Sequence, residues 1–343
     1  MPPRDHPAHP AVPVPAALLA PGPRERLAQG MTMRWLPQGP WPVMLTPFRD
    51  DLSIDLDGVD AYTDWLIELG SAGLFTVSLS SEMYDLSAEE QLVLAERVRT
   101  RAAGRVPVIA AATTAGDWRA QADRVAEVAA TGVDAVVLIS SLVAPPDAAD
   151  STWIDTVEHV LDAVPGVDLG IYECPLPYKR LLPLHTVRWL AQTGRFTFYK
   201  DTSHSLATMT ERLNVLGDSR LRLYNAAIAS LVPSIRAGAA GLSGYAASVY
   251  PDLVAWLCRH ARDADHDDVT RVQRVLTVAE HSINLRYPTS AKVLLDSSSR
   301  LSWLARSRWK PETIGAHEGE PLRQLASLVA DLDLGRAHLH PTR

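Results

Sequence analysis

Phe196-Thr-Phe-Tyr-Lys200-Asp-Thr-Ser203 is a short apolar run that ends at a lysine and then turns polar. Its aromatic and β-branched residues are typical of a buried parallel strand, and the polar residues that follow predict a loop at its C-terminal end. In folds built from parallel strands, reactive groups collect at that end. Partial removal from water weakens the preference of a lysine for its charged form, and a neutral amine attacks carbonyl carbons. Two simpler roles for Lys200 stay open: reaching solvent from the strand end, or pairing with Asp201.

Seven further apolar runs of β character flank this stretch, spaced by about thirty residues or slightly less, as strand–helix units require. They are Pro42–Leu45, Leu74–Leu79, Val106–Ala112, Ala135–Ser140, Leu169–Glu173, Leu221–Asn225 and Gly241–Tyr245. Amphipathic helical patterns separate the runs, such as the one that carries Val59, Tyr62 and Leu66. Eight strand–helix units predict an α/β fold, a closed (β/α)8 TIM barrel. No glycine-rich nucleotide motif follows a predicted strand, so no nucleotide cofactor is expected.

Helical patterns continue beyond the eighth unit, and the chain divides into four predicted parts. They are a disordered extension over residues 1–38, the barrel over 39–262, a C-terminal helical region over 263–335 and a flexible tail over 336–343. The appended helices are expected at Asp268–Leu285, Ser290–Leu295, Leu301–Trp309 and Pro321–Leu332. Within the barrel, Ser87-Ala-Glu-Glu90 has the form of a capping box that starts a helix. Glycines are expected to end helices at Gly70, Gly104, Gly132, Gly194 and Gly217.

The composition of the 343 residues is that of a folded, acidic protein with a sizeable core. Apolar residues make up 47% of the chain, and the formal net charge is -7. Because no basic excess exists to displace counterions from phosphates, no nucleic-acid partner is expected. The two cysteines, Cys174 and Cys258, form neither a disulfide framework nor a metal-ligand cluster, which favours a cytoplasmic protein without a metal. The apolar run Ala16–Ala20 is too short to span a membrane or to act as a secretory signal.

Reactive or polar side chains occupy the ends of three predicted strands, in Ser78-Leu-Ser-Ser-Glu82, in Tyr172-Glu-Cys-Pro175 and at Lys200. In a barrel these ends face one cavity. An amine that forms a Schiff base, a phenol that moves protons and a serine-rich turn that binds a carboxylate together suit 2-oxo acid chemistry. Asn225 and Ser243, at the ends of the seventh and eighth strands, are candidates for binding substrate hydroxyls or for satisfying backbone groups only.

Five landmarks resemble, in order and spacing, the Schiff-base aldolase family that contains dihydrodipicolinate synthase and N-acetylneuraminate lyase. The landmarks are Thr46-Pro-Phe48, Glu82 with Leu86-Ser-Ala-Glu-Glu90, Tyr172 with Pro175, Tyr199-Lys-Asp-Thr-Ser203, and Gly238-Ala-Ala-Gly-Leu-Ser243 before Pro251. The resemblance covers Trp41–Leu295. It implies that Lys200 forms the Schiff base and that Tyr172 carries protons. It also implies a small-molecule 2-oxo acid substrate and a homo-oligomer, either a dimer or a tetramer.

The second loop departs from the family pattern, which usually reads Gly-Thr-Thr-Gly-Glu. Leu79 stands where the resemblance implies a proton-relaying hydroxyl, and leucine neither donates nor accepts a hydrogen bond. Ser80 keeps a hydroxyl at the position that resembles the carboxylate binder, whereas Ser81 replaces a glycine and is unfavourable if that position needs a positive φ. Both serines are candidate substrate-binding residues. The loop Thr113-Thr-Ala-Gly-Asp-Trp118 also lacks the tyrosine that a neighbouring subunit often contributes in this family.

Two departures near Tyr172 point away from dihydrodipicolinate synthase itself. Glu173 stands where the family commonly has asparagine, and Pro177 stands where an arginine often receives the second substrate. We therefore expect a lyase or aldolase that acts on a 2-oxo acid of the pyruvate or sugar-acid type. Two alternatives stay open: a Schiff-base dehydratase or decarboxylase of a 2-oxo sugar acid, and a barrel that binds a 2-oxo acid with little turnover. Cys174 has no histidine partner and is expected to pack.

Overall fold

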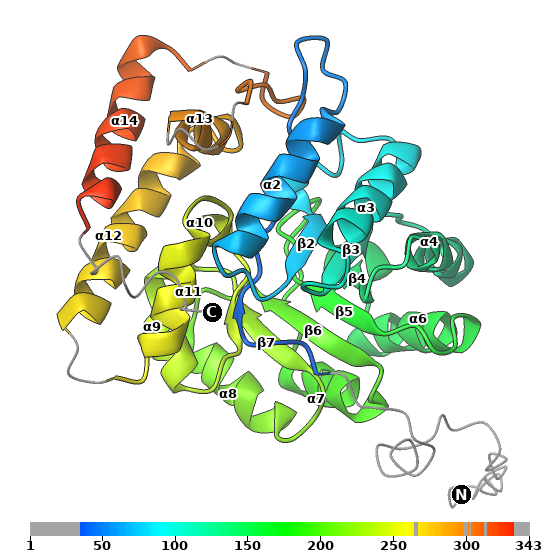
Figure 1. The fold of residues 1–343 in the computed structure, drawn as a ribbon. Coiled ribbons are helices and arrows are strands. Elements are labelled where there is room, and N and C mark those ends of the chain that lie inside the picture. The colour runs from blue at the N-terminus through cyan, green and yellow to red at the C-terminus, as the bar shows by residue number, and fades with distance from the viewer. Residues whose placement is uncertain (1–34, 264–266, 298–300, 302, 312–313, 333–343) are drawn as a thin grey trace, which may run out of the picture. The chain divides into compact units, whose positions relative to one another are not determined.

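The computed structural model describes residues 35–263, 267–297, 301, 303–311 and 314–332. Eight parallel strands form one sheet in the order β1-β8-β7-β6-β5-β4-β3-β2 (Figure 1). The strands are β1 Gly39–Pro40, β2 Leu74–Val77, β3 Val108–Ala112, β4 Ala135–Ile139, β5 Leu169–Tyr172, β6 Phe196–Asp201, β7 Arg222–Asn225 and β8 Gly241–Leu242. The predicted (β/α)8 barrel is confirmed. The predicted tail at 336–343, and the predicted disordered extension except residues 35–38, lie outside the described residues.

The first strand closes the barrel by changing partners along its length. Trp41 donates its backbone N–H to Leu242 of β8, and two residues later Val43 bridges to Phe75 of β2. The backbone N–H of Met44 also donates to the Phe75 carbonyl at 2.9 Å. The regular strand therefore ends before the predicted run Pro42–Leu45, which instead supplies the bridge to β2.

Helices follow the strands as the amphipathic patterns predict. They are α2 Leu56–Glu68, η1 Leu79–Ser81, α3 Ala88–Ala102, α4 Trp118–Ala130, α5 Ser140–Val143, α6 Asp150–Ala163, α7 Leu184–Thr193, α8 Leu206–Leu216, η2 Ile228–Ser230, α9 Leu231–Arg236, α10 Tyr245–Val249 and α11 Pro251–His260. The capping box at the start of α3 is confirmed, since the Ser87 hydroxyl accepts from the Glu90 N–H and the Glu90 carboxylate accepts from the Ser87 N–H. All five glycines expected after helices have a positive φ, which a residue without Cβ adopts at little cost.

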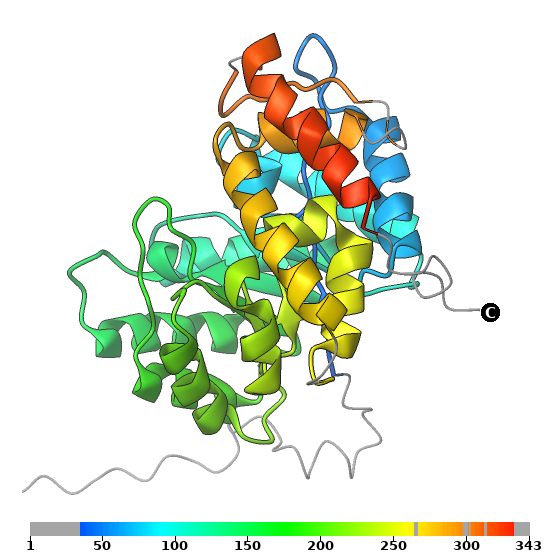
Figure 2. The same ribbon diagram turned by 90° about the vertical axis from the view of Figure 1, so that its left-hand side faces the viewer.

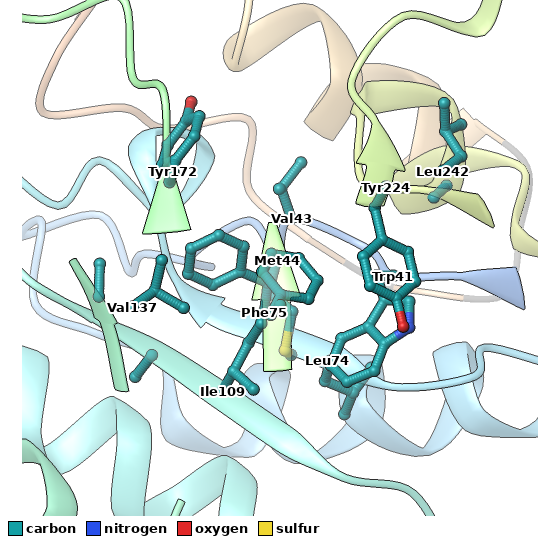
Figure 3. Close-up of a cluster of buried hydrophobic side chains, with 14 of the residues drawn as sticks. Trp41, Val43, Met44, Leu74, Phe75, Ile109, Val137, Tyr172, Tyr224 and Leu242 are labelled. Atoms are coloured by element: carbon teal, nitrogen blue, oxygen red, sulfur yellow. The ribbon is translucent and has the colours of Figure 1, made fainter. Parts of the chain in front are cut away.

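Aromatic residues fill the barrel interior below the C-terminal ends of the strands (Figure 3). The Phe198 ring packs 5.3 Å from Trp41 and 4.7 Å from Tyr224, measured between ring centroids. Phe75 joins this cluster to Tyr172, whose ring centroid lies 6.0 Å away. In Figure 3 the hydroxyl of Tyr172 points away from the cluster. The packed aromatic layer therefore supports Tyr172 from below, and its hydroxyl lies outside the apolar cluster.

Three further helices follow the barrel, α12 Asp267–Asn284, α13 Thr289–Ser297 and α14 Ala316–Ala330. Helix α12 packs on α11 and η2, and α14 packs on α12 and α13 (Figure 2). The helix predicted at Leu301–Trp309 is wrong, because the described residues of this segment form no helix. No helix among the described residues is long and apolar enough to cross a membrane.

A buried carboxylate explains why that segment is not helical. The Glu82 side chain accepts hydrogen bonds from the Ser307 hydroxyl and from the backbone N–H groups of Arg308 and Trp309. Its second oxygen lies 2.7 Å from the Lys292 ammonium. Backbone donors that a helix would use internally are thus directed at a buried charge. This tertiary contact overrides the amphipathic pattern of the segment.

Candidate functional site

Strands β5 and β6 bring Lys200 and Tyr172 together. The two residues are register partners on neighbouring parallel strands, so their side chains project from the same face of the sheet. The Lys200 Nζ lies 4.2 Å from the centroid of the Tyr172 ring. Only 5% of Lys200 and 3% of Tyr172 is exposed. The predicted amine and phenol therefore form one buried pair at the C-terminal ends of their strands.

The Lys200 amine has no carboxylate partner among the described residues, so the alternative that it pairs with Asp201 is wrong. Asp201 faces the opposite side of the strand, where it forms an ion pair with Arg212 of α8. The alternative that Lys200 reaches solvent does not fit its burial either. Burial without a compensating charge lowers the pKa of Lys200 from 10.5 to about 7. A large fraction of this amine is therefore neutral near pH 7, which a nucleophilic amine requires.

Lys292, the second buried lysine of the described chain, differs from Lys200 in its partners. Lys292 is as deeply buried as Lys200, but its ammonium lies 2.7 Å from Glu82 and also donates to the Arg306 carbonyl. Burial lowers the pKa of Lys292 too, but the Glu82 carboxylate opposes that shift, and an amine engaged by a carboxylate and a backbone carbonyl is a poor nucleophile. Of the two buried lysines, only Lys200 is placed to react.

Three buried charged residues, Arg212, Glu173 and Asp201, connect the C-terminal ends of β5 and β6. The Arg212 guanidinium binds the Glu173 carboxylate at 2.7 Å and also pairs with Asp201. Tyr199 donates its hydroxyl to Glu173 at 2.7 Å. Because Glu173 directly follows Tyr172 and Asp201 directly follows Lys200, this network fixes the backbone on which both reactive side chains stand.

We expect the reactivity of Lys200 toward a 2-oxo acid to rise with pH through about pH 7. The amine attacks only when neutral, and with a pKa of about 7 its neutral fraction grows about tenfold per pH unit below that value and levels off above it. The initial rate of borohydride-trapped adduct formation with pyruvate, measured from about pH 5 to 9, checks this. A rate that still rises about tenfold per pH unit up to pH 9 would indicate an amine with the pKa of an exposed lysine.

The serine-rich turn after β2 places its two candidate serines differently. The Ser81 hydroxyl donates to the Ser78 carbonyl and accepts from the Ser78 N–H, so it is used inside the turn. The positive φ that would be unfavourable for a serine does not occur at Ser81. It occurs at the next residue, Glu82, whose φ is 63°. Ser80 is buried beside the hydroxyl of Tyr287. Of the two hydroxyls, only that of Ser80 is not used inside the turn, and its neighbour is the Tyr287 hydroxyl.

The strand-end residues Asn225 and Ser243 also differ in their free hydrogen-bonding capacity. The Asn225 amide donates to the hydroxyls of Ser230 and Ser234, and its oxygen accepts from the Ala227 N–H. Asn225 therefore serves its own loop, as the backbone-satisfying alternative predicts. The Ser243 hydroxyl is buried at the end of β8 and has no hydrogen-bond partner among the described residues. A buried hydroxyl left unpaired is a candidate for contact with a ligand.

Around Tyr172 lie groups that the sequence pattern did not single out as site residues. Cys174 neighbours its phenol, and Tyr84 and Tyr245 lie close enough to influence its ionisation. Tyr245 stacks on Tyr287 with ring centroids 4.0 Å apart. These tyrosines come from loops and from the C-terminal region, so no local spacing connects them to Tyr172. In the described part of the chain, no three histidine, cysteine or acidic residues are grouped to hold a metal ion.

The geometry agrees with comparisons against known proteins. The family model for the "Dihydrodipicolinate synthetase family" matches residues 37–298. The 4-hydroxy-tetrahydrodipicolinate synthase of Oceanobacillus iheyensis is 28% identical over 259 residues, which cover 75% of this chain and 85% of that protein.

Two solved structures share the fold at low identity. Dihydrodipicolinate synthase of Bacillus anthracis superimposes with a TM-score of 0.76 at 20% identity, covering 84% of this chain and 97% of that one. YagE of E. coli K12, a prophage protein of the same family crystallised with pyruvate, has a TM-score of 0.76 at 20% identity, covering 85% and 98%.

Proposed function

The chain belongs to the dihydrodipicolinate synthetase family, whose members are carbon–carbon lyases of the class I aldolase type, and from this premise we propose that Lys200 and Tyr172 carry its reaction. The substrate is a 2-oxo acid, and the natural one is a 2-oxo sugar acid. The observation that carries this proposal is a buried amine with a pKa of about 7 and no acidic partner among the described residues, 4.2 Å from a phenol ring.

The chemistry follows from these two groups. The neutral Lys200 amine attacks the carbonyl carbon of the substrate, and the carbinolamine then loses water to give an iminium ion. The iminium draws electrons from the neighbouring carbon. The hydroxyl on the next carbon gives up its proton through Tyr172, so the carbon–carbon bond breaks, a carbonyl fragment leaves and the electron pair is held as an enamine. The enamine then takes up a proton, and water hydrolyses the iminium to release the 2-oxo acid product and the Lys200 amine. Tyr172 supplies the proton that leaves with the carbinolamine hydroxyl and accepts protons in the reverse steps. Burial raises the pKa of Tyr172 well above its usual value, so the phenol starts the cycle protonated.

The choice of substrate class rests on Pro177, which stands near Tyr172 where the family often has an arginine. Pro177 has no group that binds an amino acid where the family often has arginine. Arg180, three residues further, is committed to the Asp150 carboxylate and to the Ala148 carbonyl. This supports a substrate without the amino-acid end that dihydrodipicolinate synthase receives. Ser80 and Ser243 are the hydroxyls we assign to the carboxylate and to the hydroxyls of a sugar acid.

The test is reductive trapping. Purified protein is incubated with pyruvate and, separately, with a panel of 2-oxo sugar acids, reduced with borohydride, and analysed by intact mass and peptide mapping. We expect one adduct per chain, on Lys200, and release of pyruvate from at least one sugar acid. No adduct, or an adduct on another lysine, would refute the proposal.

Product analysis separates the two alternatives. A dehydratase or decarboxylase forms the same adduct but releases water or carbon dioxide without splitting the carbon chain. A binding barrel, suggested by Leu79 in the second loop, forms the adduct with negligible turnover.

We further propose that the chain forms a homo-oligomer, a dimer or a tetramer. Val278 and Leu285, on α12 and just after it, are 67% and 69% exposed, so these apolar side chains of the C-terminal region are accessible for burial against a second copy. Light scattering coupled to size exclusion measures the assembly directly. A monomer at micromolar concentration with full activity would refute it.

A further inference from the structure

The turn that carries Ser80 contains a strained backbone position. Glu82 directly follows η1, and its φ of 63° lies in the left-handed region, which costs free energy in any residue with a Cβ. Such a conformation persists where surrounding contacts hold it. Thr46, after β1, holds one part of the turn, because its hydroxyl donates to the Ser81 carbonyl at 2.8 Å. The remaining support of the turn comes through the Glu82 side chain.

Four interactions hold the Glu82 carboxylate, and all four come from the C-terminal region. One oxygen pairs with the Lys292 ammonium at 2.7 Å, and both side chains are fully buried. The other oxygen accepts from the Ser307 hydroxyl at 2.9 Å and from the backbone N–H groups of Arg308 and Trp309 at 2.6 Å and 2.9 Å. We call the segment 306–309 the C-terminal clasp.

The C-terminal clasp is also fixed to the barrel independently of Glu82. Arg308 donates to both carboxylate oxygens of Glu90 in α3, at 2.8 Å and 2.7 Å, and to the Leu52 carbonyl in the loop after β1. Its guanidinium lies 4.9 Å from the centroid of the buried Phe48 ring. The clasp is therefore an anchored segment that can hold the Glu82 turn in place.

We propose that Glu82 and the C-terminal clasp are positioning elements of the substrate site, which set the Ser80 hydroxyl to bind the substrate carboxylate. The inference rests on the proposed function, in which Ser80 binds that carboxylate. The clasp acts through geometry, because the side chain it holds lies two residues after Ser80. It also acts through charge, because Lys292 and the three N–H and O–H donors compensate a carboxylate that would otherwise repel an anionic substrate.

The test compares pyruvate with methyl pyruvate, because only pyruvate carries a carboxylate. The readouts are the half-saturating concentration and the maximal rate of borohydride-trapped adduct formation on Lys200. Glu82→Gln should raise the half-saturating concentration of pyruvate about tenfold, the factor for one weakened hydrogen bond to a charged group. The maximal rate with pyruvate, and both values for methyl pyruvate, should stay within a few-fold of the unmodified protein.

A double variant shows whether Glu82 acts through Ser80. Ser80→Ala alone should raise the half-saturating concentration of pyruvate and leave that of methyl pyruvate unchanged. Adding Glu82→Gln to Ser80→Ala should cause no further rise, because a turn without the hydroxyl has nothing left to position.

Ser307→Ala gives a milder change and carries the test if Glu82→Gln does not fold. It removes one donor to Glu82 but keeps the ion pair with Lys292. The half-saturating concentration of pyruvate should rise in the same direction by about threefold. The value for methyl pyruvate should again stay unchanged.

Two controls separate positioning from a general loss of stability. Arg286→Met removes an ion pair with Glu318, 2.8 Å long and partly exposed, that also lies in the C-terminal region. Val157→Ala opens a gap in the fully buried face of α6 and lowers stability without touching the turn. Both should leave the half-saturating concentrations unchanged. Circular dichroism and urea unfolding verify that each variant is folded.

The outcomes separate the positioning role from the function on which it rests. A folded Glu82→Gln variant with an unchanged value for pyruvate would overturn the positioning role, as would equal rises for pyruvate and methyl pyruvate. No effect of Ser80→Ala, or a further rise in the double variant, would overturn it too. In each of these cases the adduct on Lys200 still supports the proposed function. If the unmodified protein forms no adduct on Lys200, both proposals are overturned.

Discussion

Replacing Lys200 with alanine is expected to abolish the trapped adduct and to lower turnover by roughly 10⁴-fold or more, as the loss of a covalent nucleophile does in other enzymes. The chain holds a second buried lysine, Lys292, but its amine is engaged by the Glu82 carboxylate and by the Arg306 carbonyl. It therefore does not substitute for Lys200. The measurement is turnover with the best 2-oxo acid, together with intact mass after borohydride.

Lys310→Ala is the control for the loss of a lysine as such. This side chain is exposed beside Trp309, away from β6, and its removal should leave both turnover and adduct intact. If Lys200→Ala retains an adduct, the position of that adduct by peptide mapping identifies the true amine. An adduct on Lys292 would contradict the role of the Glu82 ion pair described above.

Arg212→Met is expected to lower the free energy of unfolding by about 3–5 kcal/mol. The variant leaves the carboxylates of Glu173 and Asp201 buried without their cation, and both are essentially inaccessible to water. Urea unfolding at neutral pH measures the loss. Burial already raises the pKa of Glu173, and removal of Arg212 raises it further, so the variant should regain part of its stability as the pH falls and this carboxylate takes up a proton.

An exposed ion pair provides the comparison for Arg212. Arg97 binds both oxygens of Asp60 at 2.7 Å, but its side chain is 39% exposed. Arg97→Met should therefore cost only about 0–1 kcal/mol. Equal losses in the two variants would contradict the view that the buried network locks the strand ends carrying Tyr172 and Lys200.

Local patterns in the chain were sufficient to predict the barrel and to place Lys200 and Tyr172 at the ends of neighbouring strands. Runs of β-type residues alternate with amphipathic helices, and a strand places every second side chain on one face. Those two periodicities alone place Lys200 and Tyr172 at the C-terminal ends of neighbouring predicted strands. The capping box at Ser87 was predictable for the same reason, because its partners are three residues apart.

Contacts between distant segments determined the conformation of Leu301–Trp309, and hydrogen-bond partners determined which candidate site residues remain unpaired. Leu301–Trp309 has a helical pattern, but its backbone donors turn toward Glu82, more than two hundred residues earlier. Side-chain partners likewise committed Asn225 and Ser81 to their own turns, whereas Ser243 was left unpaired.

The surroundings of Tyr172 depend on tertiary structure in the same way. Its neighbours Tyr84 and Tyr245 reach it from the loop after η1 and from the start of α10. The charge state of Lys200 is set by burial and by the capture of Asp201 by Arg212, an interaction across the sheet. Residue type and order therefore specify which groups can react, but desolvation and pairing, which arise only when distant segments pack together, specify how each group is tuned.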